Sequence, residues 1–232
     1  MPRIKLPKLP LERLDRRRLR QKYKKVLNCA EGVDGDMVNE SIDNYLLEDV
    51  DYKGKVCLDL GANIGGFTQV ALDSGAEMVY AVDCDARNFE MLENNFKNDD
   101  FVELIFTAVS GLKDKTLKIY KSNSNNSHCS TSIVSKMRFG EYDEVPNTHI
   151  KKLFKKYQPD IVKIDVESAE YTMLDDILDY FPDVLFIEFH SGKHKHLMDD
   201  AIQRFSEKYT HSKIEPLIVF GGTMAYDCFF KK

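Results

Sequence analysis

The sequence lacks any long hydrophobic run. No stretch approaches the roughly 18 apolar residues that a membrane-spanning helix needs. The basic first 25 residues also contain no apolar segment of the kind that marks a secretory signal. We therefore expect a cytoplasmic protein with no membrane span.

Cysteine is also scarce. The five cysteines are scattered, and no two of them form a CxxC pair. Cys57 and Cys84 fall in or beside predicted strands, where buried free thiols are common in a reducing compartment. This pattern argues against a disulfide framework and against a zinc site.

The charge is unevenly distributed along the chain. Residues 1–25 carry eleven Lys and Arg against two acidic residues, whereas the whole chain of 232 residues has a net charge of -5. We expect residues 1–35 to be a basic N-terminal arm or helix and residues 36–232 to be a single domain with one core. The arm is either a solvated helix folded back on the acidic body or, through residues 1–25, a contact for nucleic acid.

Strands alternate with helices along the rest of the chain, which predicts a doubly wound, mainly parallel α/β sheet. A first helix is expected after an N-cap at Asp36. A hairpin at Gly221-Gly222 is expected to add an antiparallel strand at the end. The predicted strands are 55–60, 78–82, 102–109, 116–120, 160–166, 183–190, 214–220 and 224–230, and the later helices are 66–73, a segment containing Phe89, Leu92 and Phe96, 169–181 and 196–209.

The segment 121–148 does not fit this alternation. It is polar, rich in Ser and Asn, and long for a connection within a compact domain. A substrate lid and a flexible insertion explain it equally well.

The stretch "VCLDLGANIGGFT", residues 56–68, predicts a buried strand, a glycine loop and the start of a helix, as in nucleotide-binding βα units. Dinucleotide folds need a glycine at the position of Asn63, where the backbone approaches a pyrophosphate. NAD is therefore disfavoured. Asp83, 22 positions after Gly61 and at the end of the next strand, suits a ribose-binding acid, with a helix N-cap as the alternative.

The segments "DLGANIGGFT", "VYAVDCDARNFEMLENNF", "VKIDVESAEYTML" and "DVLFIEFH" together resemble FkbM-type class I methyltransferases, which use S-adenosylmethionine. The resemblance runs from about residue 54 to the end, and it implies a seven-stranded sheet with a reversed last strand. It also implies that the glycine loop holds the methionine end, that Asp83 holds the ribose, and that residues 107–109 flank the adenine. The cofactor-binding residues implied are Asp59, Gly61, Ala62, Asn63, Gly65, Asp83, Ala108, Val109 and Asp165.

Three residues depart from the family pattern. Asp83 stands where the family often has Glu, and Cys84 stands in place of a usual proline. Ser168 replaces a usual glycine in the segment after the fourth strand of the sheet, so the turn there is expected to differ.

Four candidate catalytic residues end two neighbouring strands: Asp165 and Glu167, and then Glu188 and His190. Spacing of two places each pair on one face, at the carboxyl edge where ligands bind. His190 or Asp165 would act as general base, with Glu167 and Glu188 orienting the substrate. Alternatively, Glu188 and His190 pair structurally with Lys163 or a backbone donor.

A divalent metal, Mg²⁺ or Mn²⁺, is compatible with these four side chains, with His194 and His196 nearby. No compact metal signature is present, so a metal is not favoured.

The sequence therefore predicts an S-adenosylmethionine-dependent O-methyltransferase that acts on a sugar, glycan or other small metabolite. Two alternatives remain open. One is methylation of nucleic acid (ribose 2′-O) with the help of the basic arm, and the other is a binding module that keeps the cofactor pocket without turnover.

Overall fold

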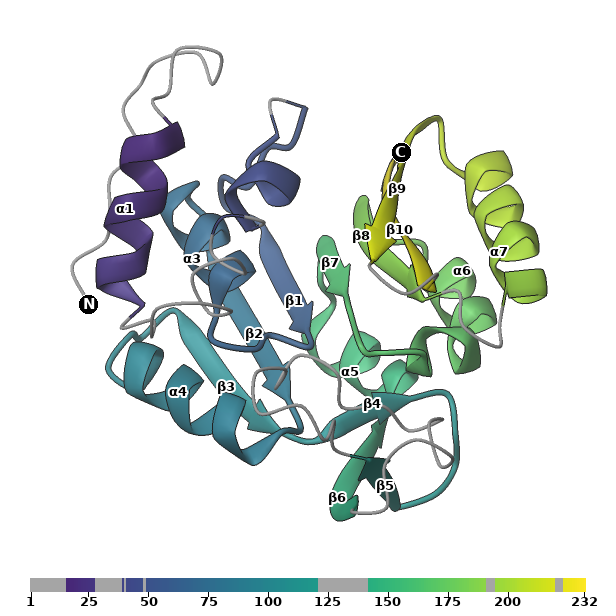
Figure 1. Cartoon of the computed structure of the whole chain (residues 1–232), viewed down its shortest axis with the longest axis horizontal. Coiled ribbons are helices and arrows are strands. Elements are labelled where there is room, and N and C mark those ends of the chain that lie inside the picture. Colours follow the sequence, from purple (N-terminus) through teal and green to yellow (C-terminus); the bar gives the residue numbers. More distant parts are fainter. Residues whose placement is uncertain are drawn as a thin grey trace.

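The computed structural model describes residues 16–27, 39, 41–47, 49–120, 142–190, 195–219 and 223–232. Its centre is a seven-stranded sheet with the order β3-β2-β1-β7-β8-β10-β9 (Figure 1). These strands are β1 (Val56–Leu60), β2 (Met78–Asp83), β3 (Val102–Phe106), β7 (Ile161–Ile164), β8 (Val184–His190), β9 (His211–Val219) and β10 (Thr223–Lys231). The sheet is parallel except for β10, which runs antiparallel to both neighbours. The predicted fold class, including its reversed last strand, is confirmed.

Helices cover both faces of this sheet, and each face has its own core. On one face, α1 (Arg16–Val26), α3 (Gly66–Asp73) and α4 (Ala86–Phe96) pack against strand residues such as Cys57 and Phe186. On the other, α5 (Ile150–Tyr157), α6 (Leu174–Tyr180) and α7 (Lys195–Lys208) pack against residues such as Leu58 and Leu185. Cys57 and Leu58 are adjacent in the chain, as are Leu185 and Phe186, yet the members of each pair lie on opposite faces because successive side chains of a strand point to opposite sides.

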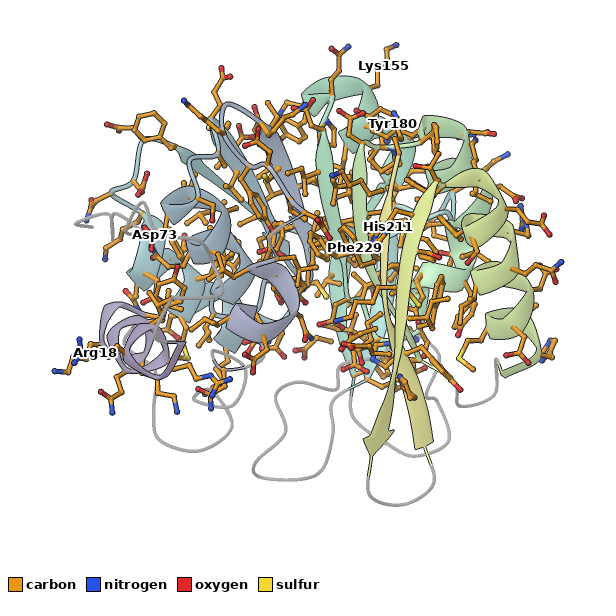
Figure 2. All side chains as sticks on the ribbon, turned by 90° about the horizontal axis from the view of Figure 1, so that it is seen from above. Arg18, Asp73, Lys155, Tyr180, His211 and Phe229 are labelled. Carbon is orange, nitrogen blue, oxygen red and sulfur yellow. The ribbon has the colours of Figure 1, made fainter. Side chains whose placement is uncertain are left out.

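The described part of the basic arm forms α1, which lies beside α3 in Figure 1. Leu19, Tyr23 and Leu27 are buried in the core, at the four-residue spacing of one helix face. The Arg20 guanidinium donates to both carboxylate oxygens of Asp43, at 2.6 and 2.5 Å. Arg18 lies on the outer side of the helix (Figure 2). This stretch is therefore packed on the body through its apolar face.

The predicted strand 102–109 is wrong as a single element. β3 ends at Phe106, and residues 108–110 form β4 (Ala108–Ser110) in a second sheet of order β4-β6-β5. Between them, the buried Thr107 donates its backbone N–H to the Asp83 carbonyl and its hydroxyl to the Pro146 carbonyl. These contacts turn the chain from the large sheet into the small one.

The predicted loop 121–148 is also partly wrong, because Tyr142–His149 form β6. This strand pairs with β4 and with β5 (Thr116–Tyr120), which the sequence did predict as a strand. Residues 121–141 lie outside the described residues, so the lid remains a prediction.

Two helices differ from expectation. The predicted helix 169–181 is divided into the 3₁₀ helix η2 (Ala169–Thr172) and α6. Thr172 packs closely against Gly111, because a Cβ on Gly111 would lie 1.8 Å from the Thr172 carbonyl oxygen. The helix α5 was not predicted, although Ile150, Leu153 and Phe154 have helical spacing and are buried.

The remaining predictions concern the first helix, the last hairpin, the cysteines and a membrane span. Asp36 and Gly221-Gly222 lie outside the described residues, but 41–45 are helical and β9 pairs with β10 as a hairpin requires. Cys57, Cys84 and Cys228 are free thiols, while Cys29 and Cys129 lie outside the described residues. Within the part of the chain that the structure describes, no helix has the length and apolarity to cross a membrane.

Candidate active site

The glycine loop joins the end of β1 to the start of α3 and lies against the residue that follows β7. Gly61 and Ala62 both donate their backbone N–H to the Val82 carbonyl at 2.9 Å. Gly61 has φ +75°, and a Cβ there would lie 1.8 Å from the Asp165 carbonyl oxygen. Only glycine fits this close approach between two backbones.

The second half of the loop depends on Gly65, which is the N-cap of α3 with φ +96°. A Cβ on Gly65 would lie 2.1 Å from Cε2 of Phe96. Asn63, between the two glycines, has φ +52°, a conformation that Asn tolerates better than most residues. The loop is thus fixed by packing from α4 and by β7.

Asp83 holds the loop from the end of β2. Its two carboxylate oxygens accept the backbone N–H groups of Asn63 and Asp85, each at 2.8 Å. Burial raises the pKa of Asp83 to about 6, although these N–H groups favour the charged form. The N-cap of α4 is Asp85, which accepts from Arg87 and Asn88, so the N-cap alternative for Asp83 is wrong.

Beneath the loop lies a buried ionic pair. Asp59 is fully buried; the Thr68 hydroxyl donates to it at 2.7 Å, and Lys163 Nζ lies 3.5 Å away. Lys163 donates to the Gly61 carbonyl at 2.5 Å and lies 3.6 Å from Asp165. Burial would lower the pKa of Lys163, but Asp165 and Asp59 outweigh it and raise the pKa.

Lys163 was named in the sequence only as a structural partner for Glu188 and His190. The structure instead joins it to the loop carbonyl and to Asp59 and Asp165. A lysine inside the apolar strand sequence "DIVKIDV" was the signal for this role, because a buried lysine needs carboxylates and carbonyls around it.

Three carboxylates surround His190 at the end of β8. Nδ1 lies 3.2 Å from Oε1 of Glu170, and Nε2 lies 3.3 Å from Glu188 and 3.4 Å from Glu167. The His190 backbone N–H also donates to Oε1 of Glu170, which is completely buried. Glu170 was not predicted as a site residue, because its position two residues beyond a turn gives no sign that it reaches β8.

The turn that brings Glu167 and Glu170 to His190 has an unusual backbone. Glu167 has φ +50° and Ser168 has φ +82°, both in the left-handed region. The family glycine at the position of Ser168 would adopt this conformation without strain. The expected difference from the turn of the family stays a prediction.

Charge in this cluster is unbalanced. Burial would lower the pKa of His190, but Glu167, Glu170 and Glu188 together raise it well above its ordinary value. Burial raises the pKa of Glu167 to about 7 and, together with repulsion from Asp165, raises that of Glu188 well above its usual range. The carboxylates thus favour the protonated form of His190, while burial favours the protonated forms of Glu167 and Glu188.

Two neighbouring hollows meet at this site. One, of about 380 Å³, is lined by the loop from Gly61 to Ile64 and by Asp165. The other, of about 420 Å³, is lined by Glu188 and Asp227, among others. Tyr45 and Lys163 line both of them. The predicted catalytic residues and the glycine loop are thus brought to one edge of the sheet.

Other predicted residues lie elsewhere. Ala108 and Val109 are buried in β4 of the small sheet. His196 is exposed on α7, and His194 lies outside the described residues. The adenine contact implied for Ala108 and Val109 stays a prediction.

Asp227 gives a pH-dependent prediction. It faces Asp165, Glu188, Glu215 and His190, and burial first, then Asp165, raises its pKa to about 6. In the unfolded chain this carboxyl ionises near pH 3.9. The free energy of unfolding therefore falls by up to about 3 kcal/mol through this group as the pH rises from about 4 to 6. Asp227→Asn keeps an oxygen that can accept from Asn44. For Asp227→Asn, urea unfolding in EDTA should show a smaller fall in the free energy of unfolding between about pH 4.5 and 7.5 than for the wild-type protein.

The exposed Asp100→Asn variant is the control and should keep the wild-type pH dependence. An unchanged pH dependence in Asp227→Asn would contradict the assignment.

Comparison with known proteins gives one family match and several solved structures of low sequence identity. The family model of the methyltransferase FkbM domain matches residues 59–211. No curated protein matches the sequence. Precorrin-6y C5,15-methyltransferase of Geobacter metallireducens is 10% identical, with a TM-score of 0.48 and coverage of 88% of this chain and 93% of that one. TYW2 of M. jannaschii in complex with AdoMet is 13% identical, with a TM-score of 0.45 and coverage of 85% and 75%.

Proposed function

This chain belongs to the methyltransferase FkbM family, and we propose that it transfers a methyl group from S-adenosylmethionine to a hydroxyl of a sugar or other small metabolite. The observation that carries this proposal is the hollow beside the glycine loop. The loop residues Gly61 to Ile64 and the carboxylate residue Asp165 line the same space. A cofactor held by the loop would therefore have a proton acceptor next to it.

The residues present fit such a cofactor. Gly61 and Gly65 keep the loop free of side chains at two points where a Cβ would collide with neighbouring atoms. Asp83 uses its carboxylate oxygens to fix Asn63 and Asp85 at the loop, and each oxygen has a second lone pair that could accept from a ribose hydroxyl. Asp59 is fully buried, so its role would be to support the loop through Thr68 and Lys163 rather than to touch the cofactor.

When bound, S-adenosylmethionine would supply a methyl group attached to a sulfonium sulfur, and the rest of the cofactor would leave as a neutral thioether. The chain must align the acceptor oxygen with that methyl and take up the hydroxyl proton. Asp165 suits this second task, because it lies in the loop hollow and the Lys163 ammonium lies 3.6 Å from it. His190 is not among the residues that line the loop hollow, and its ring nitrogens face Glu167, Glu170 and Glu188, so Asp165 is the better candidate for the base.

Calorimetry on the purified protein with S-adenosylmethionine, S-adenosylhomocysteine and NAD tests the cofactor. We expect micromolar binding of the first two and none of NAD. Asp83→Ala should weaken that binding by more than about tenfold, since one hydrogen bond to a charged group contributes about 1.5–3 kcal/mol. Binding of NAD alone would overturn the proposal.

A panel of hydroxylated acceptors then tests the chemistry. Asp165→Asn should lower turnover by about 10²–10⁴-fold with the cofactor affinity within a few-fold of wild type. Full turnover in Asp165→Asn would remove it as the base. Cofactor binding without turnover on any acceptor, including RNA, would favour the binding module. Turnover on RNA that weakens steeply with salt would favour the nucleic-acid alternative.

A further inference from the structure

We propose that Asp165, Glu188 and His190 form a site for a divalent cation such as Mn²⁺ at the carboxyl edge of the sheet. Each of these residues offers one ligand atom, and the three atoms lie within 4.8 Å of one another. His190 Nε2 and Glu188 Oε1 are 3.3 Å apart. Neighbouring ligands of an octahedral ion are separated by about 3 Å, so this spacing suits one shared ion.

The far side of His190 supports the same conclusion. Its Nδ1 lies 3.2 Å from Oε1 of Glu170, so in the neutral ring Nδ1 would donate its proton to Glu170 and the Nε2 lone pair would be available to a cation. Metal-binding histidines typically donate their second nitrogen to a carboxylate in this way. Glu170 itself is completely buried, and its Oε2 has no hydrogen-bond partner within the described structure.

Charge points to a cation as well. Five carboxylates gather here against the ammonium of Lys163, while Lys213, which lines the same hollow as Glu188, is paired with Glu215 at 2.8 Å. The carboxylates belong to Asp165, Glu167, Glu170, Glu188 and Asp227. Lys163 is already held by Asp59, Asp165 and two backbone carbonyls. Buried carboxylates in such excess are stabilised when they coordinate a metal ion.

Two carboxylates and one imidazole leave the remaining positions of an octahedral ion open. Carboxylate-rich sites suit Mg²⁺ and Mn²⁺, and the imidazole favours the transition metal of the two. An acceptor hydroxyl on such an ion would lose its proton more readily. This role in the reaction rests on the proposed function, whereas the existence of the site does not.

The test is titration of EDTA-treated, dialysed protein with MnCl₂, followed by calorimetry and by the electron paramagnetic resonance of free Mn²⁺. MgCl₂ and ZnCl₂ are titrated in parallel to identify the preferred ion. We expect one Mn²⁺ per chain with a Kd below about 1 mM. Absence of binding of all three ions at that concentration would overturn the site, whatever the variants do.

Variants locate the ion. Glu188→Gln should weaken Mn²⁺ binding by more than about tenfold. Glu170→Gln, a change at the positioning residue, should lower the Mn²⁺ affinity by about 10–100-fold. Glu215→Gln is the matched control, because Glu215 lines the same hollow as Glu188 without being a ligand. It should change the affinity by less than about threefold. Equal losses in all three variants would indicate a diffuse acidic surface and overturn the site.

The same samples are titrated with S-adenosylmethionine. Cofactor binding without Mn²⁺ binding would overturn the cation site alone. Mn²⁺ binding without cofactor binding would overturn the proposed function and leave the cation site standing.

Discussion

Gly61→Ala is expected to abolish S-adenosylmethionine binding and to lower the free energy of unfolding by more than about 3 kcal/mol. The added Cβ would lie 1.8 Å from the backbone oxygen of Asp165, so either the loop or the end of β7 must move. Movement of either element changes the contact between the loop and Asp165, and movement of the loop also breaks the hydrogen bonds of two loop N–H groups to the Val82 carbonyl. Calorimetry and urea unfolding measure the two effects.

The Gly54→Ala variant distinguishes the effect of the steric collision at Gly61 from the free-energy cost of placing an alanine at positive φ. Gly54 has φ +68°, close to the +75° of Gly61, but a Cβ there would meet nothing within 4 Å. It should therefore cost only about 1–2 kcal/mol and leave cofactor affinity near wild type. If both alanine variants had the same stability and affinity, the close approach at Gly61 would be refuted.

Lys163→Met is expected to be the second most damaging change. It leaves the fully buried Asp59 without its cation and removes the donor to the Gly61 and Leu60 carbonyls. Breaking a buried ion pair by removing one partner costs about 3–5 kcal/mol, because the other charge stays buried. Urea unfolding at neutral pH should show a loss of this size.

A double-mutant cycle tests whether Asp59 is the cause. In Asp59→Asn the buried negative charge is absent, so adding Lys163→Met to it should cost at least about 1 kcal/mol less than adding it to wild type. Lys156→Met, at the exposed pair with Glu103, is the control and should leave stability close to wild type. Strict additivity between the changes at Asp59 and Lys163 would contradict the pairing.

The sequence determined the parts of this protein that local patterns encode. The unit from β1 through the glycine loop to α3 was predicted with its helix bounds, because apolar runs and glycines act on the backbone at short range. The antiparallel last strand followed from the hairpin signal and the family resemblance. The convergence of Asp165, Glu167, Glu188 and His190 followed from the parallel sheet, which brings strand ends to one edge.

Only the tertiary structure decided the features that depend on distant neighbours. Residues 102–110 could continue as one strand, and packing of Thr107 against Pro146 divides them between two sheets. Glu170 faces His190, 20 residues away along the chain, only because a left-handed turn at Glu167 and Ser168 directs it there. Whether a buried side chain carries charge depends on all the groups around it. That is why the pairing of Lys163 with Asp59, and the carboxylates around His190, could not be read from local pattern alone.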